Sequence, residues 1–194
     1  MKYVKIIVLA AVCVGLAVGY YFYLSTHSGG DSEVRKEQDN LSELESLLTE
    51  NWEESYPPTP REVVKDYNRV LVCYYNENCE DKQIEKLVEM QRTLLDEELL
   101  QNNSLEDQVN SVKAEIAQYH VNERTVLDVT VGSSNETEIK EKEGKEYAYL
   151  TSVYLMKTGT EVGKTYQEYV LRKNEDGEWK ILAFRLAEAP DAVE

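Results

Sequence analysis

The chain has few of the residues that bind metals or cross-link small secreted domains. It contains 2 histidines and 3 cysteines in 194 residues. No Cys/His cluster has zinc spacing, and no segment has the spacing of a calcium-binding loop. The Gly-x-Ser-x-Gly elbow of serine hydrolases is absent as well. We therefore expect no bound metal, no cofactor and no disulfide-rich scaffold.

Positive charge is also scarce. The chain has 21 Lys and Arg against 37 Asp and Glu, which gives a formal net charge of −16 at pH 7. Binding to nucleic acid is driven by cationic side chains that neutralise phosphates, so this balance argues against a nucleic-acid partner. The same argument disfavours adhesion to anionic lipid headgroups. The excess of acid instead favours solubility.

Two cysteines remain candidates for a disulfide, because Cys13 lies inside an apolar segment. Cys73 and Cys79 are six residues apart, near the end of one expected helix and the start of the next. A bridge across that turn requires closely placed Cβ atoms. The alternative is that both are small hydrophobic residues at a helix–helix corner.

One long apolar run is present near the N-terminus. The segment from Ile6 to Leu24 has no charged residue, and Lys2 and Lys5 precede it. Its length as a helix is about 28 Å, close to the thickness of a bilayer's hydrocarbon core. The positive-inside rule places the N-terminus in the cytoplasm and the rest of the chain outside. We expect a single-pass anchor at residues 1–24 in the cell membrane.

Two further possibilities for this segment stay open: cleavage as a signal peptide, and packing against a second anchor helix. A cleaved signal peptide would require small residues at its exit, where Tyr20 to Leu24 are bulky, so an uncleaved anchor is favoured. Gly15 and Gly19 form a Gly-x-x-x-Gly pair that could pack two anchor helices together.

Residues 25–55 are predicted to be a polar linker with a short helix through Leu41 to Leu48.

Residues 56–188 have the pattern of one α+β domain, followed by a tail at 189–194. Helix signals come first: a capping box at Thr59 to Glu62, then expected helices over about 60–75, 81–100 and 104–119. After Arg124 the apolar period changes to two, and turn residues at 142–145, 159–163 and 174–177 separate the expected strands. This order predicts helices packed on one face of a curved antiparallel sheet.

The order of elements, with the segments Tyr166 to Lys173 and Gly177 to Leu182, resembles the nuclear transport factor 2-like, cystatin-like half-cone fold over about 59–187. The whole chain also resembles a family of uncharacterised, membrane-anchored proteins from Gram-positive gut bacteria. The features that carry this second resemblance are the Lys-flanked anchor, Tyr56 to Val64, and Leu94 to Leu100. It implies no activity, and half-cone folds host enzymes, binders and scaffolds alike.

The aromatic residues indicate a site. Tyrosine occurs 14 times against 2 Phe and 2 Trp, and hydroxylated aromatics suit surfaces that are half buried and half wet. Tyr147, Tyr149 and Tyr169 have the spacing of one sheet face, which Trp179 would extend, with Tyr67 on the facing helix. We expect these five residues to line a ligand-binding mouth or a dimer face. The alternative is an ordinary sheet face packed against helices.

A catalytic role is less favoured. A half-cone enzyme would use a pocket carboxylate or histidine assisted by tyrosine hydroxyls. Asp66, His120 and Asp128 are the candidates, but each has a position typical of a solvent-exposed residue, so no catalytic residue is assigned. We therefore expect a non-catalytic interaction module outside the cytoplasm, with a second copy or an envelope protein as its partner. A small-ligand binder or enzyme that uses the half-cone pocket is the alternative.

Overall fold

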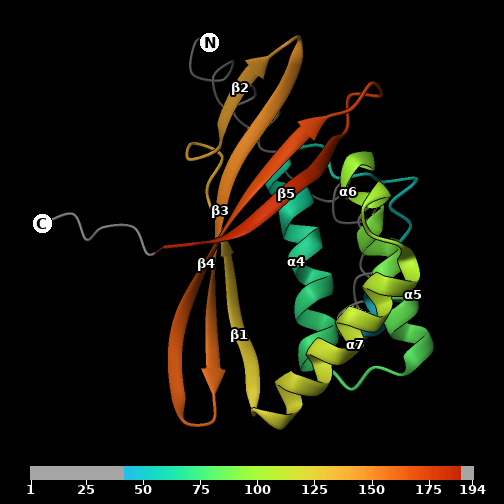
Figure 1. Ribbon diagram of the computed structural model, residues 1–194, viewed down its shortest axis with the longest axis vertical. Helices are drawn as coiled ribbons and strands as arrows, with labels where there is room; N and C mark the ends of the chain where they lie inside the picture. Colours follow the sequence, from blue (N-terminus) through green and yellow to red (C-terminus); the bar gives the residue numbers. More distant parts are fainter. Residues whose placement is uncertain (1–41, 189–194) are drawn as a thin grey trace, which may run out of the picture. The chain divides into compact units, whose positions relative to one another are not determined.

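The computed structural model describes residues 42–188, which form one α+β unit. Figure 1 shows the helices on one side of a twisted antiparallel sheet, as the sequence predicted. The helices are α3 (Glu43–Thr49), α4 (Pro60–Asn76), α5 (Asp81–Arg92), α6 (Glu97–Gln101) and α7 (Leu105–Val121). The strands are β1 (Arg124–Val131), β2 (Glu138–Lys142), β3 (Lys145–Thr158), β4 (Glu161–Lys173) and β5 (Trp179–Ala187).

The sheet is organised around β3. Its strand order is β1-β3-β4-β5, and β2 pairs with the first residues of β3 while β1 pairs with the last. The turn at Gly144 and the turn at Gly177 are the ones predicted, and both glycines have positive φ, which residues with a Cβ rarely adopt. The third turn is shorter than expected, because β4 already begins at Glu161.

Local capping explains where two helices begin. The Thr59 side chain accepts a hydrogen bond from the Glu62 backbone N–H, with Pro60 at the first helical position. The Ser104 side chain accepts from the Asp107 N–H in the same way at α7. Each interaction pairs a backbone donor that the helix itself leaves without a partner. These two helix starts are confirmed.

The single helix expected over 81–100 is wrong. Helix α5 ends at Arg92, and a new short helix begins at Glu97, with the Asp96 side chain as its N-cap. Between them the backbone pairs with the start of β5: the Asp96 N–H donates to Ile181 O at 2.9 Å, and the Ile181 N–H donates to Leu94 O at 2.8 Å. Sheet pairing therefore replaces the helical hydrogen bonds at this point.

The folded unit also begins earlier than expected. Leu47 is fully buried, and Leu44 and Trp52 are buried in the same core as α4 and the sheet. The boundary at residue 56 between linker and domain is therefore wrong, because burial of α3 makes residues 43–55 part of the domain. No helix within residues 42–188 is long and apolar enough to cross a bilayer, and the expected anchor from Ile6 to Leu24 lies outside the described residues.

Candidate functional site

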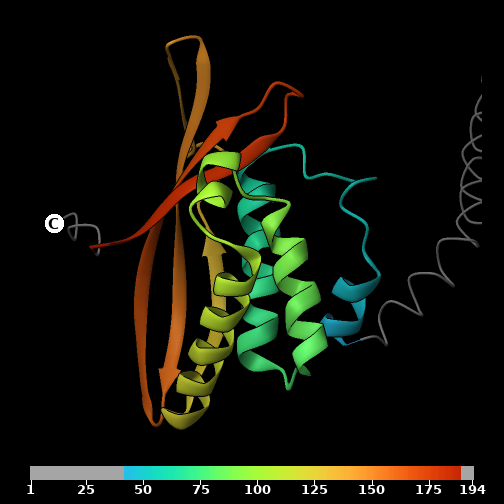
Figure 2. The same cartoon turned by 45° about the vertical axis from the view of Figure 1, so that its right-hand side comes forward.

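The pairing of β3 with β4 shows which residues lie on each face of the sheet. Tyr149 pairs with Val170, whereas Tyr169 pairs with Leu150. Since successive residues of a strand point to opposite faces, Tyr149 and Tyr169 lie on opposite faces. The expectation that Tyr147, Tyr149 and Tyr169 share one face is therefore wrong. Tyr147 and Tyr149 lie on the face opposite Tyr169. Figure 2 shows that no described helix covers that face.

The helix-covered face holds the other predicted aromatics in the core. Tyr67 and Tyr169 meet edge-to-face with ring centroids 5.9 Å apart, and both are buried. Trp179 is buried too, and its backbone carbonyl accepts a hydrogen bond from the Tyr56 hydroxyl at 2.7 Å. Buried side chains occupy the space between α4 and the sheet, and among them are Val70 and Tyr74.

A small polar network lies inside this core. The Tyr154 hydroxyl donates to the Asn68 Oδ1 at 2.5 Å, and lies 2.5 Å from the Tyr169 hydroxyl. Asn68 also donates to the Ser152 hydroxyl at 3.3 Å. Burial raises the pKa of Tyr154 to about 12, so the phenol stays neutral at physiological pH. Among the described residues, no buried side-chain nitrogen or oxygen lacks a hydrogen-bond partner, so the network is satisfied within the core.

A groove with a volume of about 530 Å³ crosses the uncovered face. We call it the sheet groove. Its floor is a row across three strands, in which Tyr149 of β3 pairs with Val170 of β4 and Val170 with Ala183 of β5. The next row is polar, with Thr151, Glu168 and Arg185. Tyr149 is 36% exposed, so a large aromatic surface faces solvent here.

The rim of the sheet groove carries charges of both signs. Arg185 and Glu168 form an ion pair at 2.6 Å, and Lys140 pairs with Glu138 at 2.9 Å. The Lys140 ammonium also lies 5.2 Å from the centroid of the Tyr149 ring. Glu136 also lines the groove. Paired charges around an apolar floor are typical of protein interfaces, whose centre is apolar and whose rim is polar.

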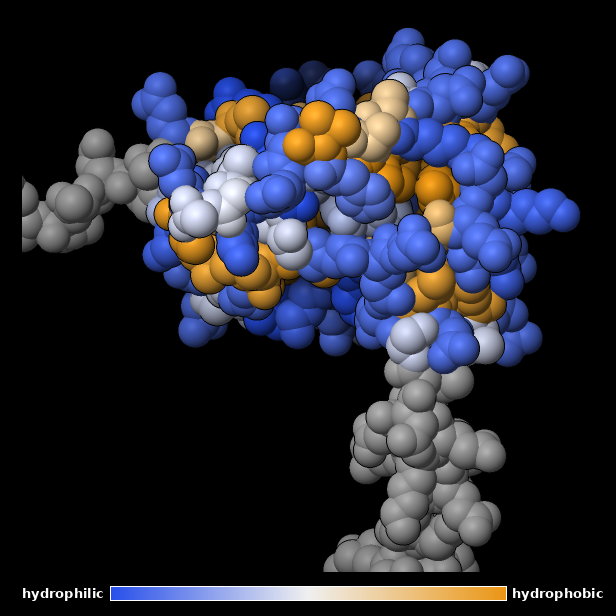
Figure 3. Space-filling view, turned by 90° about the horizontal axis from the view of Figure 1, so that it is seen from below, coloured by the Kyte–Doolittle hydropathy of each residue, from blue (hydrophilic) through white to orange (hydrophobic). Residues whose placement is uncertain are grey.

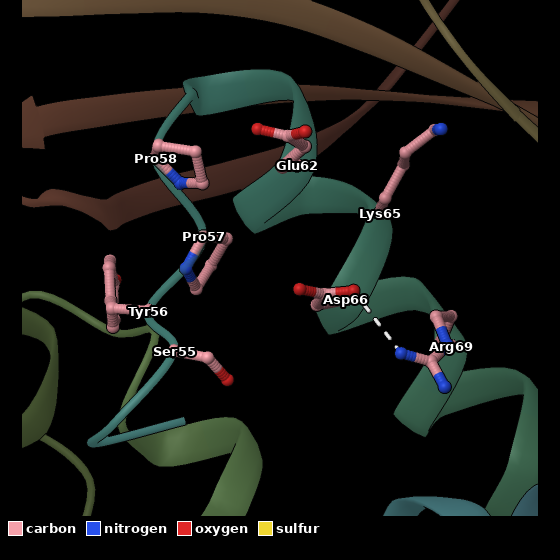
Figure 4. A pocket seen from close by; sticks show the side chains of 8 residues that line it. All are labelled: Ser55, Tyr56, Pro57, Pro58, Glu62, Lys65, Asp66 and Arg69. Carbon is pink, nitrogen blue, oxygen red and sulfur yellow. Dashed lines mark hydrogen bonds and ion pairs between the residues drawn. The ribbon is translucent and has the colours of Figure 1, made fainter. Parts of the chain in front are cut away.

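A second cavity, which we call the α4 cleft, has a volume of about 490 Å³. It lies between α4 and the connection that contains Pro57. Figure 4 shows the Asp66 carboxylate between this connection and Arg69, and shows Lys65 directed away from it. The remaining lining residues are Ser55, Tyr56, Pro58 and Glu62.

Charge in the α4 cleft is balanced by an ion-pair network. Arg69 contacts Glu50 at 2.8 Å, Glu43 at 2.9 Å and Asp66 at 3.5 Å. Burial raises the pKa of Asp66, and Arg69 only partly offsets this effect. Burial also acts to raise the pKa of Glu50, but the hydrogen bonds from Arg69 and Trp52 outweigh it and lower that pKa overall. The network joins α3 to α4, which gives these residues a structural role.

The catalytic candidates do not converge on one place. Asp66 borders the α4 cleft, His120 is exposed in the last turn of α7, and Asp128 is exposed on β1. Within the described part of the chain, no three His, Cys, Asp or Glu residues are grouped so that they could hold a metal ion. Cys73 and Cys79 are both free thiols in this structure.

Of the five predicted binding residues, Tyr149 alone exposes its ring in the sheet groove. Tyr169 also borders the groove, but its ring packs on Tyr67 on the other face. The sequence pattern did not point to Val170, Ala183, Glu168 or Arg185. The hairpin turn at 174–177 indicates that β4 and β5 pair. The register shift between Val170 and Leu171 changes which residues face each other, so alternation along the two strands does not predict this row.

Comparison with known proteins identifies a family. The family model described as Domain of unknown function (DUF6715) matches residues 1–184. No curated protein matches the chain.

Proposed function

Because the chain belongs to the family described as Domain of unknown function (DUF6715), we propose its role from chemistry and geometry: a membrane-anchored, non-catalytic interaction module outside the cytoplasm. The uncharged run from Ile6 to Leu24 behind Lys2 and Lys5 supports the anchor and its orientation. Helices on one face of a twisted sheet support a half-cone, nuclear transport factor 2-like fold for the domain. The module docks through the uncovered face of the sheet.

The sheet groove is the observation that carries this proposal. It offers an exposed aromatic residue, Tyr149, in a row with Val170 and Ala183, and a rim of paired charges. Exposed tyrosine next to aliphatic surface is the composition that interfaces favour. On the face seen from below, Figure 3 shows hydrophobic areas separated by hydrophilic side chains.

Charge directs docking to the sheet as well. Residues 43–121, which form the helices, contain 18 Asp and Glu against 7 Lys and Arg. Residues 124–187, which form the sheet, contain 11 Asp and Glu against 10 Lys and Arg. Two helical layers would therefore repel each other, whereas two sheet layers are almost neutral. We propose a second copy of this chain as the occupant. A face that carries both positive and negative side chains, such as Arg185 and Glu168, can pair with the same face of a second copy around a two-fold axis.

The best test is site-specific cross-linking in cells that make the full-length chain. A photoreactive phenylalanine analogue replaces Tyr149, and a matched variant carries it at Gln118, which is exposed on α7. We expect the Tyr149 variant to yield a dimer joined between two sheet segments, and the Gln118 variant to yield none. Capture of a different envelope protein at Tyr149 would replace the second copy as the partner. Equal yields at both positions, or none, would rule out docking through the sheet groove.

A small-ligand role is less well supported. It would need space between α4 and the sheet, where Tyr67, Val70 and Tyr74 are buried side chains. The α4 cleft is the remaining candidate, but its Arg69 is already paired with Asp66 of the cleft and with Glu43 and Glu50 beside it. Those contacts would have to break before a charged ligand could replace them.

A further inference from the structure

The corner between α4 and α5 brings the two described cysteines together. Helix α4 ends at Asn76, and the Glu77 N–H closes its last turn on the Cys73 carbonyl at 2.9 Å. The Cys79 N–H then donates to the Glu77 carbonyl at 3.1 Å, so the chain folds back immediately. As a result, Cys79 packs against the core cluster in which Cys73 is buried, and the two thiols come within hydrogen-bonding reach of each other.

The two thiols differ in access. Cys73 is 1% exposed, whereas Cys79 is half-buried in the connection that precedes α5. The hydrogen bond between them raises the pKa of Cys73, which burial raises further, and it lowers the pKa of Cys79. Since the thiolate is the reactive form, both access and acidity favour Cys79 as the first sulfur to react.

We propose that Cys73 and Cys79 form an intrachain disulfide and that the oxidant enters through Cys79. The Cys79 thiolate attacks one sulfur of a disulfide oxidant, breaks its S–S bond and forms a mixed disulfide, and the first thiol leaves. The Cys73 thiol then attacks the Cys79 sulfur, and its proton passes to the departing sulfur, which leaves as the second thiol. The pair loses two electrons and two protons, and the oxidant is reduced to two thiols.

The effect of this bond is local and structural. It would join the last turn of α4 to the residues that start α5, so the acidic helical layer would be held at one corner by a covalent link. Because the turn already places Cys79 against the core cluster that contains Cys73, we expect closure to need only local adjustment of the two side chains. Persistence of the bond in the cell rests on the extracytoplasmic location proposed above, where disulfides survive. The chemistry itself can be tested on the purified chain.

The experiment uses the full-length chain in detergent, with Cys13→Ser so that two cysteines remain. Oxidised glutathione is added, free thiols are alkylated, and the products are measured by mass spectrometry. We expect the chain to lose two hydrogens, to resist alkylation and to accumulate no mixed disulfide. Recovery of chains that carry glutathione on either cysteine without closure would overturn the disulfide.

Two single-cysteine variants test the order of reaction. In Cys73→Ala the mixed disulfide should form on Cys79 and persist, because the second sulfur is missing. In Cys79→Ala the buried Cys73 should form its mixed disulfide at least about tenfold more slowly than Cys79 does in Cys73→Ala. Equal rates would overturn the entry of the oxidant through Cys79. Circular dichroism confirms that each variant is folded, and the closure test requires neither variant. The cross-link at Tyr149 involves neither cysteine, so docking and disulfide formation can fail separately.

Discussion

The two faces of strand β3 have different roles although they share one backbone. Ala148, Leu150, Ser152 and Tyr154 point to the helices and are buried. The alternate residues Tyr147, Tyr149, Thr151 and Val153 stay partly or fully exposed. All described helices pack on one side, so side chains of the same kind become core on one face and candidate interface on the other. For tyrosine in this protein, position along the strand matters more than residue type.

The largest expected contrast between the faces is in stability. Tyr169→Ala should lower the free energy of unfolding by about 3–5 kcal/mol, because it removes a fully buried ring and leaves a cavity. Chemical denaturation of the two variants Tyr169→Ala and Tyr149→Ala provides the comparison. Similar losses in both would show that the uncovered face is also packed.

The polar network in the core should be the next most sensitive feature. Asn68→Ala removes the amide that hydrogen-bonds the Tyr154 and Ser152 hydroxyls. Both buried hydroxyls would then lose that hydrogen bond. We expect a loss of about 1–3 kcal/mol in the free energy of unfolding. Asn110→Ala, at an exposed position of α7, is the control and should change it by less than about 0.5 kcal/mol. A neutral Asn68→Ala variant would contradict the network.

The ion pairs that join α3 to α4 should make a smaller, pH-dependent contribution. The pKa of Glu50 is lower in the folded chain than its ordinary value of 4.5, so its contribution is present above that value and disappears as pH falls through the folded pKa. Glu50→Gln should therefore cost up to about 1 kcal/mol at pH 7, since the pair is partly exposed, and nothing in strong acid. Unfolding measured from pH 7 to pH 2 tests this, with exposed Glu53→Gln as the control. A difference that stays constant with pH would contradict the ion pair.

The smallest effect on stability should come with the largest effect on docking. Tyr149→Ala should lower the free energy of unfolding by about 1 kcal/mol or less, because the residue lies outside the core and is partly exposed. The same change should abolish self-association, which analytical ultracentrifugation of the full-length chain in detergent would measure. Unchanged association would locate any dimer contact away from the sheet groove.

Features that depend on neighbours in the sequence were predictable. Thr59 and Ser104 cap their helices through side-chain contacts three residues away, and Gly144 and Gly177 make turns that need positive φ. The change of apolar period after Arg124 marked the beginning of the sheet, which gives the α+β class. Each of these signals lies within a few residues of the feature that it predicts.

Features that depend on distant partners were not predictable in the same way. The segment from Leu94 to Asp96 has a helical pattern, but it pairs with Ile181, 86 residues after Leu95. Strand β2 is exposed along its whole length, so it has no apolar alternation to reveal it. The face on which Tyr169 lies depends on its pairing with Leu150 across the hairpin, where a shift of one residue exchanges the faces.

By itself, the sequence determined the class of fold, the starts of two helices, two of the hairpin turns and the excess of acid in the helical half of the domain. These are properties of composition and short-range geometry. The tertiary structure alone decided that residues 43–55 belong to the domain, that Tyr149 rather than Tyr169 exposes its ring in the sheet groove, and that Cys79 packs against the core cluster that contains Cys73. Each of these depends on which surfaces pack against one another, and packing is set by contacts between residues that the sequence pattern does not pair.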